Sequence, residues 1–173
     1  MRISVAVALD IGTTTIAGAG VDAGSGAVIA EDSIANPQSK WGSDVLSRVN
    51  AISKDPALLD EMRRSVVAAC NAIIKSVSGG SKPIEVSVAG NSVMEHLLLG
   101  VSPLPMSRVP YKPAFKDAKR MRASEAGFDA GADAPLFVFP LIGGFVGGDA
   151  VAVALALGLA HKNGVCLAID IGT

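Results

Sequence analysis

The sequence has few charged residues, few aromatic residues and only two cysteines. Lysine and arginine number 15 against 16 aspartates and glutamates, so the net charge is −1. A protein that binds nucleic acid through its charge usually has a basic excess, which this chain lacks. Aromatic residues make up 4% of the chain, which argues against stacking on bases as its main activity. We therefore expect no nucleic-acid partner.

The two cysteines, Cys70 and Cys166, lie far apart in the sequence. Neither has a second cysteine or a group of histidines at the spacing of a zinc or iron–sulfur site. The sequence therefore predicts two reduced, buried thiols, as is usual in a cytoplasmic protein.

The chain also lacks a pattern typical of a signal peptide or a membrane-spanning helix. The first apolar run is short and ends at Asp10 without a cleavage pattern. The longer apolar stretch 136–160 contains a proline, several glycines and Asp149, which a spanning helix rarely carries together at its centre. We expect a cytoplasmic protein with no membrane partner.

Half of the chain is apolar and 19 residues are glycine, a composition typical of a buried sheet with tight turns. Apolar β-branched runs at 3–9, 14–21 and 27–34 predict three antiparallel strands. The other predicted elements are strands at 84–89, 136–139 and 165–169 and helices at 43–53, 56–78, 92–99 and 149–159. Strands joined through helices run parallel, so we expect an α/β fold with a mixed five-stranded sheet flanked by helices. The segment 111–133 shows no clear pattern.

A short motif occurs twice, each time after an apolar run. Asp-Ile-Gly-Thr at 10–13 reappears at 170–173. A carboxylate at the end of a strand can hold a hydrated Mg²⁺ ion, and glycine lets the backbone approach a phosphate closely. Threonine hydroxyls and the N–H groups of the turn can then donate hydrogen bonds to that phosphate. The repeated motif predicts nucleotide binding by two similar halves.

These two turns resemble the phosphate loops of the actin-like ATPases, which include sugar kinases, acetate kinase and heat-shock chaperones. The resemblance implies a ribonuclease H-like fold in each half, with ATP and Mg²⁺ held between the halves. It places the phosphates at Asp10, Gly12, Thr13, Thr14 and Thr15 in the first loop and at Asp170, Gly172 and Thr173 in the second. It also implies that Asp10 and Asp170 hold Mg²⁺ through water.

Three further motifs are similar to one branch of this superfamily, the ATP-dependent reductive activators of corrinoid proteins. They are Asn36-Pro37-Gln38 with the stretch 41–48, the stretch 88–100, and Gly-Phe-Val-Gly-Gly-Asp at 144–149. The resemblance implies reactivation of a corrinoid protein from Co(II) to Co(I), with that protein as partner. Two alternatives are a sugar or acyl kinase of the same superfamily and a non-enzymatic actin-like scaffold.

The chain departs from this branch in two ways. Such activators carry an iron–sulfur module, and this chain has no cysteine cluster, so we expect the cluster in a module absent from it. The sequence also stops inside the second phosphate loop. We therefore expect residues 1–164 to form the first actin-like subdomain and 165–173 to begin a truncated second one. Such a fragment would be inactive alone, and its open cleft leaves a homodimer as an alternative.

Several single residues are candidates for specific roles. Asp149 opens a predicted helix, so it is either a helix cap or a catalytic or Mg²⁺-associated carboxylate, and we take it as the candidate catalytic residue. Asn91 is predicted to cap the helix that follows it. His96 is predicted to lie near a helix C-terminus rather than to bind a metal.

Two groups of residues have no settled role in the sequence. Asn36, Gln38 and Arg48 are predicted to face either the cleft or the corrinoid partner. A basic cluster is predicted to be either a solvated face or a docking patch for an acidic partner. Its members are Lys112, Lys116, Lys119, Arg120 and Arg122.

Overall fold

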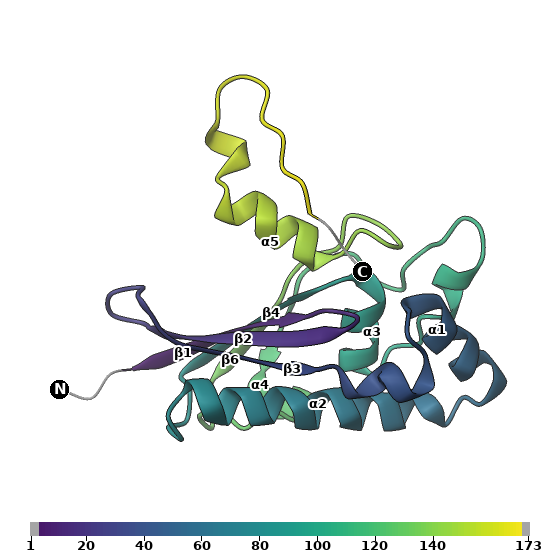
Figure 1. Cartoon of the computed structure of the whole chain (residues 1–173), viewed down its shortest axis with the longest axis horizontal. Coiled ribbons are helices and arrows are strands. Elements are labelled where there is room, and N and C mark those ends of the chain that lie inside the picture. The colour runs from purple at the N-terminus through teal and green to yellow at the C-terminus, as the bar shows by residue number, and fades with distance from the viewer. Residues whose placement is uncertain (1–3, 171–173) are drawn as a thin grey trace.

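A computed structural model of the chain describes residues 4–170. Within that range the strands form one mixed six-stranded sheet in the order β3-β2-β1-β4-β6-β5 (Figure 1). The strands are β1 (Val5–Ile11), β2 (Thr15–Asp22), β3 (Val28–Ala35), β4 (Glu85–Gly90), β5 (Lys119–Arg122) and β6 (Pro135–Val138). β1, β2 and β3 pair as an antiparallel meander, while β4 runs parallel to β1 and β6 parallel to β4. The predicted mixed α/β architecture is therefore confirmed.

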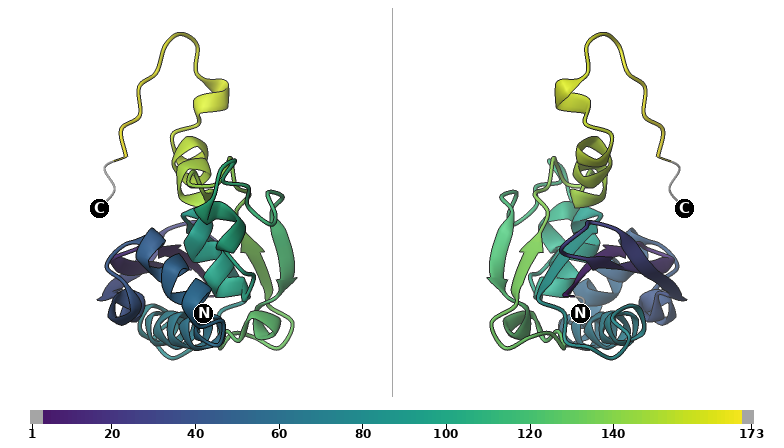
Figure 2. Two further views of the ribbon diagram at one scale, coloured as in Figure 1. Left: turned by 90° about the vertical axis from the view of Figure 1, so that its right-hand side faces the viewer. Right: turned by 90° about the vertical axis from the view of Figure 1, so that its left-hand side faces the viewer.

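Helices pack on both sides of this sheet. They are α1 (Val45–Lys54), α2 (Leu58–Val77), α3 (Ser92–Leu99), α4 (Ala123–Ala126) and α5 (Gly148–Ala156). The long helix α2 lies along one face, and α5 lies on the other side (Figure 1). Seen from either end of the molecule, α5 and the segment after it project away from the sheet (Figure 2).

The core lies between the sheet and α2. Alternate residues of β1, namely Val5, Val7, Leu9 and Ile11, are buried, as expected for a strand with one face on the core. Gly20 in β2 allows α2 to approach closely, because a Cβ atom built there would lie 2.2 Å from the carbonyl oxygen of Val77. This close packing fixes the strands that carry the β1–β2 turn.

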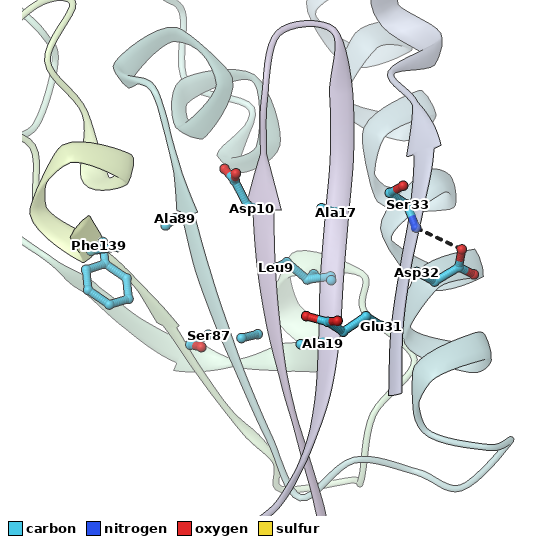
Figure 3. Close-up of a pocket in the computed structure, with 13 residues that line it drawn as sticks. Leu9, Asp10, Ala17, Ala19, Glu31, Asp32, Ser33, Ser87, Ala89 and Phe139 are labelled. Carbon is cyan, nitrogen blue, oxygen red and sulfur yellow. Dashed lines mark hydrogen bonds between the residues drawn. The ribbon is translucent and has the colours of Figure 1, made fainter. Parts of the chain in front are cut away.

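The opposite face of the sheet carries small side chains and is only partly covered. A cavity of about 730 Å³ lies over it and reaches from β3 to Ala152 in α5. Figure 3 shows Ala17, Ala19, Ser87 and Ala89 along its floor, with Asp10 at the end where β1 turns into β2. The two faces of one sheet are therefore packed very differently.

The structure corrects the expected number of strands in this sheet. The sixth strand, β5, is a charged strand, Lys-Arg-Met-Arg, that pairs antiparallel with β6. Because it lies at the edge of the sheet, its side chains alternate only between partly buried and exposed, and its sequence shows no apolar run. It lies within 111–133, where the sequence showed no pattern.

A strand at 165–169 is not present in the structure. That segment is irregular, and its apolar residues Val165, Leu167 and Ile169 are exposed. Apolar alternation produces a strand only where a neighbouring strand supplies hydrogen bonds, and none lies beside this segment among residues 4–170. Cys166 is exposed as well, so the prediction of two buried thiols holds for Cys70 alone.

Helix boundaries also differ slightly from those predicted. The second helix was expected to begin at Pro56, but α2 begins at Leu58. Asp55 instead caps the C-terminus of α1. The Asp55 carboxylate accepts a hydrogen bond from the N–H of Ala57, 3.1 Å away, within the turn between the two helices. For the described part of the chain, the structure contains no helix long and apolar enough to cross a bilayer.

Candidate functional site

The turn between β1 and β2 opens into a cleft of about 610 Å³. Predicted site residues from three parts of the chain line it: Asp10, Gly12, Thr13, Thr14, Thr15, Asp149 and Asp170. Gly172 and Thr173 lie outside the described residues. The motifs thus come together in one cleft, although Asp10 and Asp170 lie near opposite ends of the sequence.

Two helices begin at this cleft. Asn91 precedes α3 and accepts a hydrogen bond from the N–H of Met94 at 3.0 Å, so the predicted cap is confirmed. Helix α5 begins after Gly147, which provides no side-chain cap. A helix N-terminus carries partial positive charge and unpaired N–H groups, both of which favour an anion. Asn91 and Asp149 stand in these first turns and line the cleft.

One interpretation of the sequence made Asp149 the N-cap of α5, and the structure contradicts it. Gly147 occupies that position, and the Asp149 carboxylate instead accepts a hydrogen bond from the N–H of Ala150 at 2.8 Å. One oxygen is therefore engaged locally, while the residue still lines the cleft.

The β1–β2 turn is held by polar side chains, of which Asn36 and Arg48 are buried on its inner side. Asn36 Nδ2 donates to the carbonyl oxygen of Gly12 at 2.8 Å, and Arg48 Nη2 donates to that of Thr13 at 2.6 Å. Asn91 Nδ2 donates to the Thr13 hydroxyl at 3.0 Å. These residues position the turn. The prediction that Asn36, Gln38 and Arg48 face the cleft or a partner surface is wrong, because all three are buried.

Arg48 is fully buried without a carboxylate partner among residues 4–170. Besides Thr13, its guanidinium donates to the carbonyl oxygen of Gly42 at 2.9 Å and to Gln38 Oε1 at 3.3 Å. Burial lowers the pKa of Arg48, and the charge of Asp44 partly offsets this. A buried cation is costly unless its donors are satisfied, and here acceptors of the protein pair with the guanidinium. Because the guanidinium lies directly beneath the turn, it contributes positive potential there.

Three successive buried residues of α3 each contact a different segment around the cleft. The Met94 sulfur accepts a hydrogen bond from Arg48 and lies behind the β1–β2 turn. Glu95 lies against Gly148 at the start of α5. His96 donates from Nδ1 to the carbonyl oxygen of Ser92 at 2.6 Å, accepts at Nε2 from the N–H of Ala114 at 3.0 Å, and stacks on Phe115.

Both His96 nitrogens are therefore engaged, which agrees with its not being a metal ligand. His96 lies in the last turn of α3, as predicted, but its ring is buried and bonded back to Ser92 instead of acting as a cation at the helix end. Burial lowers the pKa of His96, so the ring is neutral.

The carboxylates that line the cleft affect one another. Asp10 reaches solvent, yet partial burial between the cleft walls raises its pKa, and the charges of Asp149 and Asp170 raise it further. Burial also raises the pKa of Asp149, helped by Asp170, while the Ala150 N–H opposes this. Within residues 4–170 no three acidic, histidine or cysteine side chains lie close enough together to hold a metal ion directly. The charges of Asp149 and Asp170 thus oppose ionisation of Asp10 at this end of the cleft.

The basic cluster predicted from the sequence lies on and before β5, and none of its residues lines the cleft. Arg122 pairs with Glu125, and Lys119 and Arg120 lie over the rings of Phe115 and Phe137. The cluster is therefore largely solvated and locally partnered.

Comparisons with known proteins agree with this geometry. The family model described as "RACo middle region" matches residues 5–162. The corrinoid activation enzyme RamQ of Eubacterium limosum is 33% identical over 172 residues, which cover 96% of this chain and 29% of that protein. A solved structure titled "Reductive activator for corrinoid,iron-sulfur protein" superimposes with a TM-score of 0.89 at 30% identity, covering 94% of this chain and 27% of that one. The chain therefore spans less than a third of the length of either relative.

Proposed function

Since the chain belongs to the RACo middle-region family, we propose that it is the ATP-binding half of an ATPase that reactivates a corrinoid protein. The relatives named above are a corrinoid activation enzyme and a reductive activator for a corrinoid iron–sulfur protein. By analogy, the partner of this protein is a corrinoid protein whose cobalt is returned from Co(II) to Co(I) by one electron. That electron comes from an iron–sulfur centre in a module outside this chain.

The observation that carries the proposal is the convergence of Asp10, the 12–15 turn and two helix N-termini on one cleft. Backbone N–H groups, threonine hydroxyls and helix N-termini are the donors that phosphate groups require. The buried Arg48 beneath the turn adds positive charge where a polyphosphate would lie. We assign Gly12, Thr13, Thr14 and Thr15 to phosphate binding.

The residues of the cleft also suit Mg²⁺. Carboxylate oxygens from Asp10 and Asp170 are ligands of the kind this hard ion prefers, and the ion keeps several of its waters. A cation would relieve the repulsion that raises the pKa of Asp10. When bound, Mg²⁺ neutralises charge on the phosphates.

We assign to Asp149 the role of orienting the water that attacks the terminal phosphate and accepting its proton. Its position at the start of α5, on the wall facing the phosphate turn, supports this role. Departure of the cleaved phosphate after hydrolysis would change how the two halves close on the nucleotide, and so the surface offered to the corrinoid protein. Residues 1–164 would form the first half and residues 165–173 the beginning of the second.

Binding of Mg²⁺-ATP to the intact protein, measured by titration calorimetry, tests the proposal. We expect Asp10→Asn to weaken binding roughly tenfold or more, the order expected on losing an interaction with a charged group. The matched control is Asp60→Asn, which changes an exposed aspartate on α2 and should leave affinity unchanged. Equal affinity in wild type and Asp10→Asn, or no binding by the wild type, would overturn the proposed site.

A further inference from the structure

Glu95 has a carboxyl group with no solvent exposure and, among the described residues, no well-formed hydrogen bond. Its exposed fraction is 0%, and neither oxygen makes a hydrogen bond to any residue in 4–170. Buried polar groups are nearly always paired, so an orphaned carboxyl is unusual and requires an explanation. It stands in the first turn of α3, one position after Met94, which supports the phosphate turn.

The Glu95 carboxyl lies directly behind the start of α5. A Cβ atom built on Gly148 would be 2.2 Å from Glu95 Oε1 and 2.6 Å from the Phe139 Cβ. One built on Gly147 would be 2.3 Å from the carbonyl oxygen of Gly90. Only glycine fits at either position, so the backbone that leads into Asp149 rests on α3 and on the Glu95 carboxyl.

The charges around this carboxyl oppose its ionisation. Burial raises the pKa of Glu95 to about 9, and the charge of Asp149 on α5 adds to this. The backbone N–H groups of Gly148 and Gly90 act in the opposite direction and are outweighed. The other contact, Phe139, is apolar, and the neighbouring His96 is neutral and bonded to Ser92 and Ala114.

We propose that Glu95 is a positioning residue of the phosphate site: as a neutral acid it supports the 147–149 turn and keeps a second negative charge away from Asp149 and the phosphates. This inference rests on the proposed function, because it assumes that the cleft binds ATP. A neutral carboxyl fills the space behind Gly148 at no electrostatic cost to an anionic ligand. An ionised carboxyl at the same place would repel both the ligand and Asp149.

The first test needs no nucleotide. Unfolded Glu95 loses its proton above about pH 4–5, whereas the folded residue keeps it up to about pH 9. The folded state therefore binds one proton more than the unfolded state in this window, so wild-type stability falls as pH rises. Relative to Glu95→Gln, the wild-type unfolding constant should rise about tenfold per pH unit between about pH 5 and 9 and then level off.

A merely structural role for Glu95 predicts something else, namely a ratio of unfolding constants that does not change with pH. The matched control is Glu85→Gln, which changes an exposed glutamate on β4 and should give such a constant ratio. If Glu95→Gln does not fold, Glu95→Met, which is neutral and similar in shape, takes its place. In addition, the infrared carbonyl band of a protonated acid should be present in the wild type at pH 7.5 and absent from the variant.

The second test measures Mg²⁺-ATP affinity at pH 7 and at pH 10. At pH 7 we expect wild type and Glu95→Gln to bind within about twofold of each other, because the amide mimics the neutral acid. At pH 10 the wild type should bind roughly tenfold more weakly than the variant. A constant ratio of unfolding constants, or an equal loss in both proteins at pH 10, would overturn the role of Glu95 even if ATP binds. Failure of the wild type to bind Mg²⁺-ATP at any pH would instead overturn the proposed function.

Discussion

The two walls of the cleft are built in different ways. The wall formed by the β1–β2 turn is fixed by side chains: Asn36 and Arg48 bind its carbonyl groups from within the protein. The wall formed by the start of α5 is fixed by the close approach of backbone at Gly147 and Gly148. Further along α5, apolar side chains are exposed, with Leu155 69% exposed.

The wall at the β1–β2 turn is preorganised, whereas the wall at α5 is weakly supported. Burying a cation in the first wall costs free energy, but it leaves the donors of the turn already oriented. The second wall has few apolar contacts, and segments of that kind are the ones that open locally at low cost. We expect changes in the first wall to affect stability and affinity together, and changes in α5 from Asp149 onward to affect turnover or nothing.

The largest effect is expected for Arg48→Gln. The change removes the donor to the Thr13 carbonyl oxygen and leaves several buried acceptors unpaired. Each buried acceptor left without its donor costs about 1–3 kcal/mol, so the loss of several should lower the unfolding free energy by about 3–5 kcal/mol. Urea unfolding measures this, with Arg64→Gln, at an exposed position on α2, as the control that should change stability by less than about 1 kcal/mol. A loss as small as that of the control would show that the first wall does not depend on Arg48.

Asp149→Asn should separate catalysis from structure in the second wall. The amide oxygen can still accept from the Ala150 N–H, so the start of α5 should survive. The loss of the carboxylate should lower ATP turnover in the intact protein at least about 100-fold, the low end for a general base, with nearly unchanged nucleotide affinity. Turnover and the thermal midpoint are measured on one preparation. Normal turnover at normal stability would leave Asp149 without a catalytic role.

Asn91 connects the two walls, because it caps α3 with its oxygen and donates to Thr13 with its nitrogen. Asn91→Asp keeps the cap and loses the donor, whereas Asn91→Ala loses both. We expect the alanine variant to lose about 1 kcal/mol of stability and the aspartate variant much less. Both should weaken Mg²⁺-ATP binding, and Asn50→Ala, at an exposed position on α1, should not. Normal binding by Asn91→Asp would mean that the bond to Thr13 does not matter for the ligand.

The sequence predicted the sheet and the position of the β1–β2 turn because both depend on local patterns. Apolar runs predicted β1, β2, β3, β4 and β6, and the repeated Asp-Ile-Gly-Thr motif identified the turn that opens into the cleft. The polar residues behind the turn were noticed as motifs, but their roles were not predicted. An arginine is usually exposed, so only the packed structure shows that Arg48 is buried beneath Thr13.

Glu95 was missed for the same reason, since nothing in its neighbourhood in the sequence indicates that α5 covers it. The prediction for the segment 165–169 was wrong in the opposite sense. Its alternating apolar residues predict a strand, yet strand formation also requires a partner strand beside it. Local pattern thus predicts what a segment is able to form, and contacts distant in sequence decide what it does form.

The smallest effect is expected in α5 beyond the cleft. Leu155 is 69% exposed, so Leu155→Ala removes little buried surface and should change the unfolding free energy by less than about 0.5 kcal/mol. The matched variant Leu97→Ala removes a fully buried leucine of α3, next to the residues that support both walls, and should cost about 2–5 kcal/mol. Urea unfolding of both variants at one pH gives the difference directly. If Leu155→Ala cost as much as Leu97→Ala, Leu155 would be buried in the protein in solution, and the second wall would be as firmly packed as the first.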